Sequence, residues 1–174
     1  KEIVLLKSQA ERCKDILLRL SKNPDDLKDN FFEKIKIIDL LKLNFDKFNI
    51  NKKLNINFLN FNTDSKILYK DEINYALGNI IQNAIIYSKT KVDIILETTD
   101  KDLIIKIIDD GYGFSKEVLD KIGEPYISKN KEGMGLGIFI SKNLIENLKG
   151  NVFFYNSAHN NAIVEIKFEK TILI

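Results

Sequence analysis

Hydrophobic residues in the first twenty positions of the chain recur at alternating intervals of three and four. They are Ile3, Leu6, Ala10, Cys13, Leu17 and Leu20. This spacing is the a/d seam of a helix in a coiled coil or bundle. Pro24 ends it, because a proline pushes the preceding residue out of the helical region. The helix packs either on its own domain or against a partner in a dimer, and the narrow seam favours the dimer.

From residue 34 onward, strand-like and helix-like periods follow one another. Strands, with alternating apolar and polar residues, are predicted at 34–37, 54–58, 67–69, 92–98, 103–109, 152–155 and 162–168. Helices are predicted at 39–48, 71–88, 116–121 and 135–148. Asp71 is expected to cap the second of these helices, and Gly150 is expected to end the last. The sum is an α+β fold in which helices cover one face of a mixed sheet.

Composition narrows the class of protein. The 174 residues are 44% hydrophobic, which suffices for one core and an extra element. The net charge is +2, with acids and bases mixed, so the basic face of a nucleic-acid binder is missing and no such partner is expected. The single cysteine, Cys13, excludes an internal disulfide and fits a reducing compartment. The chain opens at Lys1 without a methionine, so we expect a fragment whose parent carries any membrane segment upstream.

Five of the eight glycines lie in two clusters. Residues 109–113 read Asp-Asp-Gly-Tyr-Gly after a predicted strand, and residues 133–137 read Gly-Met-Gly-Leu-Gly at the start of a predicted helix. Glycine serves where φ is positive or where a ligand approaches the main chain, and the N-terminus of a helix attracts phosphate. Each cluster alone is more typical of a turn, and neither is a Walker or Rossmann motif.

The helix predicted at 71–88 carries a third candidate feature. Asn79 and Asn83 are four residues apart and share one face, which Tyr87 continues. Asparagine offers Mg²⁺ a neutral oxygen, and Mg²⁺ bound to ATP is held by few protein oxygens. Two asparagines mean little in an Asn-rich chain, but these border a broad apolar face of the helix. They are therefore candidates for a metal site.

Taken in order, the three segments resemble the N box, G1 box and G2 box of the GHKL ATPase superfamily, in the form found in sensor histidine kinases. The boxes read Asn79-Ile-Ile-Gln-Asn83-Ala84, Asp109-x-Gly111-x-Gly113 and Gly133-x-Gly135-Leu136-Gly137. The similarity covers roughly residues 34–169. It implies a Bergerat-type two-layer α/β sandwich that binds ATP with Mg²⁺. Residues 1–22 would be the C-terminal part of a dimerisation and phosphotransfer helix hairpin, and residues 31–174 the catalytic ATP-binding domain.

The resemblance assigns roles at the adenine and metal ends of the site. Asn83 matches the asparagine that coordinates Mg²⁺, and Asn79 lies one turn earlier; both are counted as catalytic. Tyr87 matches an aromatic residue that stacks near adenine. Asp109 matches the carboxylate that accepts from the adenine amino group, and a carboxylate there would repel the carbonyl of guanine. Without the other motifs, Asp109 is simply a turn residue and Tyr87 a core aromatic.

Glycines complete the assignment. Gly111 and Gly113 would let the chain turn against the base. The remaining cofactor-binding positions, at the end of the ATP lid and the phosphate-facing start of a helix, are Gly133, Gly135, Leu136 and Gly137. Residues 124–126 fall at the F box of the family, and the lid at about 128–134.

The chain also departs from the family pattern. Ile86 stands where a basic residue often precedes the aromatic, and Gly123 stands at the F-box phenylalanine position. Asn160 and Asn161 replace frequent glycines of the final hairpin. Asn79 stands where gyrase-like ATPases carry a glutamate base, so water attack should be slow and transfer to another acceptor favoured.

Within the kinases, residues 9–17, 109–111 and 123–126 resemble the RegB/PrrB redox-responsive subgroup. On this resemblance, the phosphoacceptor histidine lies upstream of the chain. The sole histidine, His159, is in a predicted hairpin turn and is expected to be a surface residue. Cys13, at a seam position, is expected to pack in the helix interface, although a seam cysteine could pair across a dimer.

The predicted function is transfer of the γ-phosphoryl group of Mg·ATP to a histidine on a helix hairpin of the same or a partner chain, then to an aspartate of a response regulator. The resemblance implies a cytoplasmic domain of a homodimeric parent, with any inner-membrane anchor upstream. Two alternatives stay open. One is a GHKL ATPase or an anti-sigma-type serine kinase, against which Asn79 and the N-terminal helix argue. The other is a domain that senses ATP without catalysis, which Ile86 and Gly123 allow.

Overall fold

The computed structural model describes residues 34–49, 54–59, 65–125 and 136–174. The chain falls into two compact units, Lys1–Phe32 and Glu33–Ile174, and every described residue belongs to the second. The helix predicted over residues 1–20, its role in a hairpin and the position of Cys13 lie outside the described residues and stay predictions.

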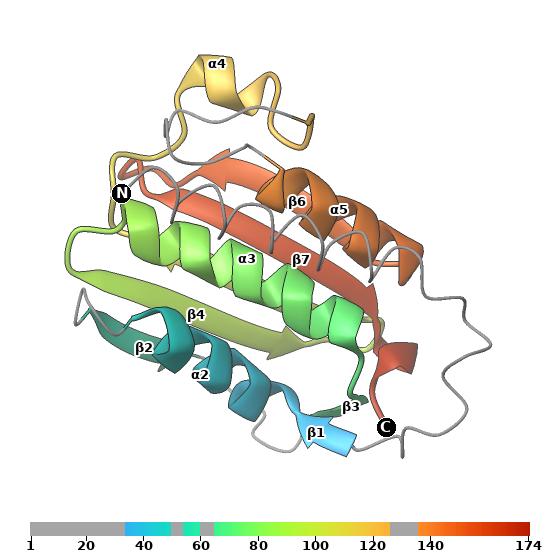
Figure 1. The fold of residues 1–174 in the computed structure, drawn as a ribbon. Helices are drawn as coiled ribbons and strands as arrows, with labels where there is room; N and C mark the ends of the chain where they lie inside the picture. Colours follow the sequence, from blue (N-terminus) through green and yellow to red (C-terminus); the bar gives the residue numbers. More distant parts are fainter. Residues whose placement is uncertain (1–33, 50–53, 60–64, 126–135) are drawn as a thin grey trace, which may run out of the picture. The chain divides into compact units, whose positions relative to one another are not determined.

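Five strands form the main sheet, in the order β2-β4-β5-β7-β6 (Figure 1). The strands are β2 (Asn55–Leu59), β4 (Lys91–Thr98), β5 (Asp102–Asp109), β6 (Asn151–Asn156) and β7 (Ala162–Glu169). β2 runs parallel to β4, and the other neighbours are antiparallel. A separate two-stranded sheet pairs β1 (Lys34–Lys36) with β3 (Lys66–Leu68). The sheet is therefore mixed, as the alternation of residues predicts.

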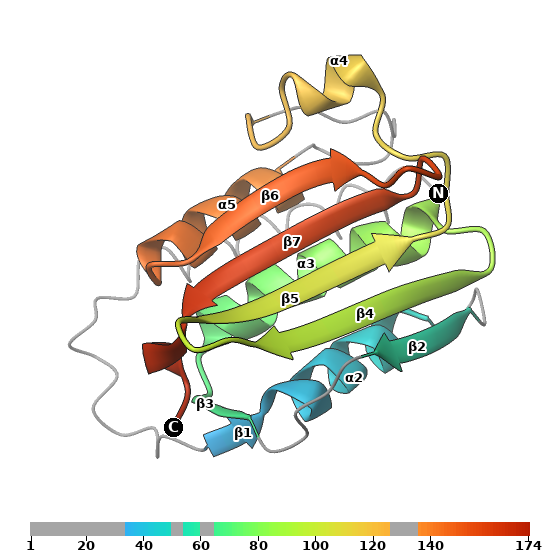
Figure 2. The ribbon, with the colours of Figure 1, turned by 180° about the vertical axis from the view of Figure 1, so that it is seen from behind.

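Three helices lie across one face of the main sheet: α2 (Ile37–Phe48), α3 (Asp71–Tyr87) and α5 (Gly137–Asn147). Seen from behind, the sheet stands in front of them, and no described helix covers that other face (Figure 2). The short helix α4 (Lys116–Leu119) and a 3-10 turn, Lys170–Ile172, complete the described elements. The predicted layered α+β fold is confirmed. No helix in the described ranges is long and apolar enough to span a bilayer.

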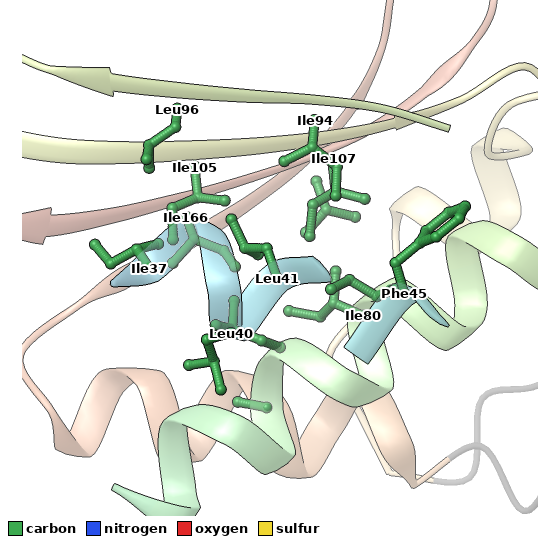
Figure 3. Close-up of a cluster of buried hydrophobic side chains, with 14 of the residues drawn as sticks. Ile37, Leu40, Leu41, Phe45, Ile80, Ile94, Leu96, Ile105, Ile107 and Ile166 are labelled. Atoms are coloured by element: carbon green, nitrogen blue, oxygen red, sulfur yellow. The ribbon is translucent and has the colours of Figure 1, made fainter. Parts of the chain in front are cut away.

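The core lies between the two layers (Figure 3). Helix α2 contributes Ile37, Leu40, Leu41 and Phe45, each at most 1% exposed. Burying such a side chain contributes about 1.5–3 kcal/mol, so this face anchors α2 to the sheet. Strand β5 alternates buried and half-buried positions over its whole length. Its last buried position is Asp109, so the alternation that builds the core also turns a carboxylate inward.

The two helix-end predictions were wrong in detail. The residue before α3 is Lys70, which makes no side-chain cap; Asp71 is already helical, and its carboxylate accepts from the hydroxyl of Tyr69 at 3.2 Å. After α5, the residue with positive φ is Lys149, at 60°. Gly150 donates its N–H to the carbonyl of Ile145 at 2.9 Å, the bond of a Schellman motif.

Candidate functional site

Asp109 ends β5 as a buried carboxylate, 7% exposed. Its Oδ1 accepts the backbone N–H of Gly111 at 3.0 Å. Burying a charge is costly unless it is hydrogen-bonded, so this bond holds the acid at the inner edge of the sheet and starts the turn that follows. A turn therefore does form here, and the carboxylate that starts it is buried.

The two glycines of the first cluster are required for different reasons. A Cβ on Gly111 would lie 2.4 Å from the backbone carbonyl oxygen of Tyr87, so no side chain fits between β5 and the end of α3. Gly113 has φ +72°, and a Cβ there would lie 2.3 Å from the carbonyl oxygen of Asn160. Both glycines are thus required by the protein's own main chain, and the approach of a ligand to them stays a prediction. Tyr87 itself is 50% exposed, so it is not a core aromatic.

Asn79 of α3 lies against the start of α5. Asn79 is 7% exposed, and its Nδ2 has no hydrogen-bond partner in the part of the chain that the structure describes. A Cβ on Gly137, the first residue of α5, would lie 3.7 Å from Oδ1 of Asn79. Asn83 donates its Nδ2 to the carbonyl of Asn79 at 3.0 Å. The structure thus brings the first and third predicted motifs together.

The first turn of α5 is suited to an anion. Leu136 precedes the helix without a side-chain cap, and the first turn carries no acidic residue. Uncapped N–H groups and the positive end of the helix dipole both favour phosphate. Gly133, Gly135 and the lid at 128–134 lie outside the described residues, so their roles stay predictions.

Helix α3 connects the two ends of the site. Asn79 and Tyr87 are eight positions apart, which is about 12 Å along a helix. One end of α3 thus faces the turn after Asp109, and the middle faces the start of α5. A nucleotide lying along α3 would place its base and its phosphates at these two ends.

Comparison with known proteins decides the family. The family described as "Histidine kinase-, DNA gyrase B-, and HSP90-like ATPase" matches residues 69–172, the span that holds α3, α5 and β4 to β7. The chain belongs to this ATPase family. It therefore carries an ATP-binding domain, and the resemblance read from the three boxes is confirmed.

Relatives of this ATPase domain include sensor histidine kinases. Sensor histidine kinase RegB of Cereibacter sphaeroides is 29% identical over 171 residues, which cover 88% of this chain and 36% of the relative. Sporulation kinase A of Bacillus subtilis is 28% identical over 103 residues, covering 58% of this chain and 17% of the relative. The chain thus spans about a third or less of these relatives' length. The predicted likeness to RegB is confirmed.

Solved structures agree on the fold. The catalytic domain of histidine kinase ThkA has a TM-score of 0.69 at 24% identity, covering 81% of this chain and 97% of that one. The mycobacterial sensor histidine kinase MprB has a TM-score of 0.67 at 18% identity, covering 80% and 97%. The Bergerat-type sandwich predicted for residues 34–169 is therefore confirmed.

The described residues of the ATPase domain fit ATP. A buried amide nitrogen without a partner costs about 1–3 kcal/mol, and the side chain of Asn79 lies against the start of α5, where N–H groups favour phosphate. Asp109 supplies an acceptor at the other end. A polar group at each end is thus compatible with a bound ATP.

Two departures from the family pattern have a physical explanation. Asn160 adopts φ +62°, a conformation that asparagine tolerates better than most residues, so it takes the place of a glycine in the β6–β7 turn. Gly123 has φ +90°, and a Cβ there would lie 2.9 Å from Cδ of Lys142. The stem of Lys142 therefore occupies the space beside Gly123. Ile86 is 42% exposed, and nothing in the structure explains it.

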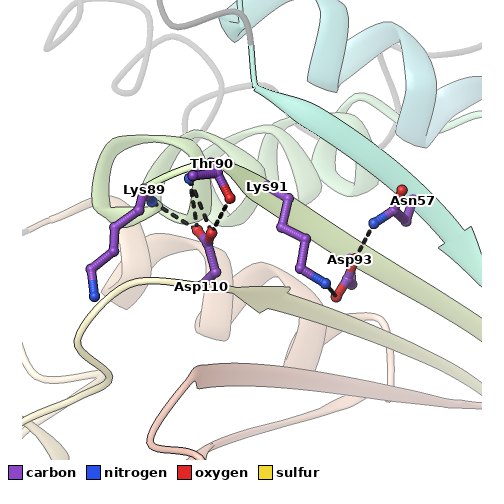
Figure 4. A network of polar contacts seen from close by, with 6 residues as sticks. All are labelled: Asn57, Lys89, Thr90, Lys91, Asp93 and Asp110. Atoms are coloured by element: carbon purple, nitrogen blue, oxygen red, sulfur yellow. Dashed lines mark hydrogen bonds and ion pairs between the residues drawn. The ribbon is translucent and has the colours of Figure 1, made fainter.

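The interpretation of the sequence missed two side chains around Asp109. Asp110 fell at an unspecified position of the G1 box, yet its carboxylate accepts from Lys89 and Thr90 in the turn after α3 (Figure 4). Asn156, at the end of β6, bonds both backbone groups of Phe114. Their partners lie 20 to 42 residues away in sequence, so no local pattern marked them.

Proposed function

We propose that this chain is the catalytic domain of a sensor histidine kinase, which transfers the γ-phosphoryl group of ATP to a histidine outside residues 1–174. The observation that carries the proposal is the buried amide of Asn79, which lies beside the first turn of α5 without a partner among the described residues. A group buried in this way in a native fold calls for an explanation, and a bound triphosphate supplies one. The crystal structure of full-length ShkA in complex with AMPPNP, 19% identical to this chain, supports a nucleotide in this fold.

Adenine recognition is assigned to the loop after β5. The carboxylate of Asp109 accepts from the exocyclic amino group of adenine, while the carbonyl of guanine would face it with a second acceptor. The missing side chain of Gly111 leaves the main chain close to the carbonyl of Tyr87. Tyr87, half-exposed at the end of α3, would cover the base.

Magnesium is assigned to Asn83. Its Nδ2 is engaged by the carbonyl of Asn79, so its Oδ1 is the atom that would hold the ion together with phosphate oxygens and water. Bound there, Mg²⁺ neutralises charge on the phosphates. The protein's own contribution is to orient the triphosphate between Asn79, Asn83 and the N–H groups at the start of α5.

The side chains favour transfer over hydrolysis. The amide of Asn79 is neutral and cannot accept a proton from water, so no general base activates water at this position. In the transfer, the bond from the γ-phosphorus to the bridging oxygen breaks, a bond to the imidazole nitrogen of the acceptor forms, and ADP leaves. His159 lies exposed in the β6–β7 turn, and the acceptor is proposed to be on a helix hairpin of the parent dimer. A response-regulator aspartate then receives the group.

The test combines the chain with Mg·ATP and a separately produced phosphoacceptor hairpin of the parent protein. Acid-labile phosphate on the hairpin histidine supports the kinase, and a hairpin in which that histidine is alanine is the control. Steady phosphate release without the hairpin would instead support an ATPase, and phosphate stable to acid on a serine of a partner would support a serine kinase. If the chain binds ATP but yields neither phosphorylated protein nor free phosphate, it is a nucleotide sensor, and the proposed catalysis is overturned.

A further inference from the structure

Residues 109–114, here called the base loop, are tied to the rest of the fold on two sides. One tie runs to the turn after α3, and the other runs to the hairpin of β6 and β7. Asp110 makes the first tie and Asn156 makes the second. Neither is among the residues proposed to bind the nucleotide.

Asp110 makes the first tie (Figure 4). Its carboxylate accepts the N–H of Lys89 at 2.7 Å, the N–H of Thr90 at 3.0 Å and the hydroxyl of Thr90 at 2.5 Å. Partial burial alone would raise the pKa of Asp110, but the hydrogen bonds from Thr90 and Lys89 outweigh it and lower the pKa to about 2. The group is therefore a charged acceptor that joins the end of β5 to the end of α3, and charge-assisted bonds of this kind are the stronger ones.

Asn156 makes the second tie. Its Oδ1 accepts the N–H of Phe114 at 2.8 Å, and its Nδ2 donates to the carbonyl of the same residue, also at 2.8 Å. Asn160 adds a bond from its Nδ2 to the carbonyl of Tyr112 at 2.8 Å. A Cβ on Gly113 would lie 2.9 Å from Oδ1 of Asn156, so the loop and the hairpin are in close contact. The β6–β7 hairpin thus fixes the far end of the base loop.

The two ties enclose the residues that meet the base. Asp109 and Gly111 lie on either side of Asp110 in the sequence, and Gly111 has no room to move toward the carbonyl of Tyr87. A hydrogen bond to a ligand weakens steeply when its angle or length departs from the optimum. Groups held by supporting hydrogen bonds keep the geometry that binding needs.

We propose that Asp110 and Asn156 are positioning residues, which hold the base loop so that the Asp109 carboxylate selects adenine over guanine. This inference rests on the proposed nucleotide site and adds to it the residues that set its base specificity. Neither side chain needs to touch the nucleotide, because both act through the backbone of the loop.

The experiment measures three dissociation constants for the whole chain and its variants: Mg·ATP, Mg·GTP and inorganic tripolyphosphate. Asp110→Ala and Asn156→Ala should each weaken ATP binding about tenfold. A misoriented base loop should lose about the free energy of one to two hydrogen bonds to the base. Tripolyphosphate binding should change less than about twofold, because its contacts lie at α5. The ratio of ATP to GTP affinity should fall about tenfold.

Two controls match these variants. Asp102→Ala removes a carboxylate at the opposite end of β5 from the base loop. Asn151→Ala removes an exposed asparagine at the opposite end of β6 from Asn156. Both controls should keep the ATP to GTP ratio of the unmodified chain.

Conservative variants separate positioning from folding. Asp110→Asn retains an oxygen for the N–H groups of Lys89 and Thr90 and should recover most of the ratio. Asn156→Asp retains the acceptor for Phe114 and loses the donor, so it serves if the alanine variant fails to fold. A folded variant that keeps the ratio, or that loses ATP, GTP and tripolyphosphate equally, overturns the inference. If the unmodified chain binds no ATP, the proposed function fails instead.

Discussion

At the base end of the site, Asp109 accepts the N–H of Gly111 at 3.0 Å, and the following loop is bonded to the turn after α3 and to the β6–β7 hairpin. At the phosphate end, the amide nitrogen of Asn79 is buried with no partner among the described residues, and α5 begins without a side-chain cap. The same helix, α3, borders both ends. The loop at one end is therefore held by the protein itself, whereas at the other end the amide nitrogen of Asn79 is left unpaired among the described residues.

The difference indicates how binding free energy is distributed. A loop whose geometry is already fixed loses little conformational entropy on binding, so its hydrogen bonds to a base contribute both affinity and specificity. An unpaired buried amide destabilises the free protein, and a ligand that pairs it removes that cost. The base end should thus decide which nucleotide binds, and the phosphate end should decide how strongly the nucleotide stabilises the fold. Four variants test this division.

The largest effect is expected at the metal position. Asn83→Ala removes the proposed Mg²⁺ ligand and should weaken Mg·ATP binding on the order of 100-fold, the upper range for disturbed metal sites. Affinity for ATP in EDTA should stay within about twofold, since no metal contributes there. Calorimetric titration with and without Mg²⁺ measures both. If ATP affinity depends equally on Mg²⁺ in the variant and in the unmodified chain, Asn83 is not the metal ligand.

At the base end, Asp109→Asn replaces the carboxylate by an amide that can present a donor to the adenine amino group. The loss of a charged hydrogen bond, about 1.5–3 kcal/mol, predicts ATP binding weaker by about 10- to 100-fold. Tripolyphosphate binding should not change. Asp102→Asn, at the opposite end of β5, is the control, and a similar loss of ATP affinity in both variants would contradict the assignment.

At the phosphate end, Asn79→Leu should have opposite effects on stability and binding. Removing a buried unpaired amide should raise the free energy of unfolding of the ligand-free chain by about 1 kcal/mol, and the stabilisation by added Mg·ATP should shrink. Denaturant unfolding with and without nucleotide measures both. Ser141→Ala is the contrast: its hydroxyl is fully buried but donates to the carbonyl of Gly137 at 2.8 Å, so the variant should destabilise the chain.

The smallest effect concerns the charge of Asp110. Its folded-state pKa is lowered from 3.8 to about 2, so its contribution to stability is complete above pH of about 4 and is lost as the pH falls through about 2. The difference in free energy of unfolding between the unmodified chain and Asp110→Asn should therefore narrow over that range. A difference that stays constant down to a pH of about 2 would show that the charge of Asp110 contributes nothing.

The layers of the fold and the inward direction of Asp109 could be predicted because they follow from short-range periods. In β5, the two-residue repeat that buries Leu103, Ile105 and Ile107 also fixes the face of Asp109. The family resemblance gave Gly111 and Gly113 a role in turning the chain against the base, and the structure adds the backbone contacts that require glycine there. The remaining site residues were predicted from the resemblance of the three boxes to those of a known family.

What the sequence alone could not reveal depends on partners far along the chain or on backbone angles. Asn156 bonds Phe114, 42 residues away, and asparagine is so common in this chain that its position carried no signal. The end of α5 was assigned to Gly150, but Lys149 takes the positive φ. Gly150 is required for another reason, since a Cβ there would lie 2.6 Å from the ring of Phe168.

Helix α3 carries Asn79, Asn83 and Tyr87 on one continuous run of backbone. The helix therefore fixes the distances between these three side chains. The proposed metal ligand, Asn83, and the residue proposed to cover the base, Tyr87, are separated by about 6 Å along the helix. One residue inserted between Asn83 and Tyr87 would rotate the tyrosine by about 100° and shift it by about 1.5 Å. Residues on the solvent side of this segment can be replaced. An insertion or deletion, however, would misalign the proposed metal site with the proposed base site.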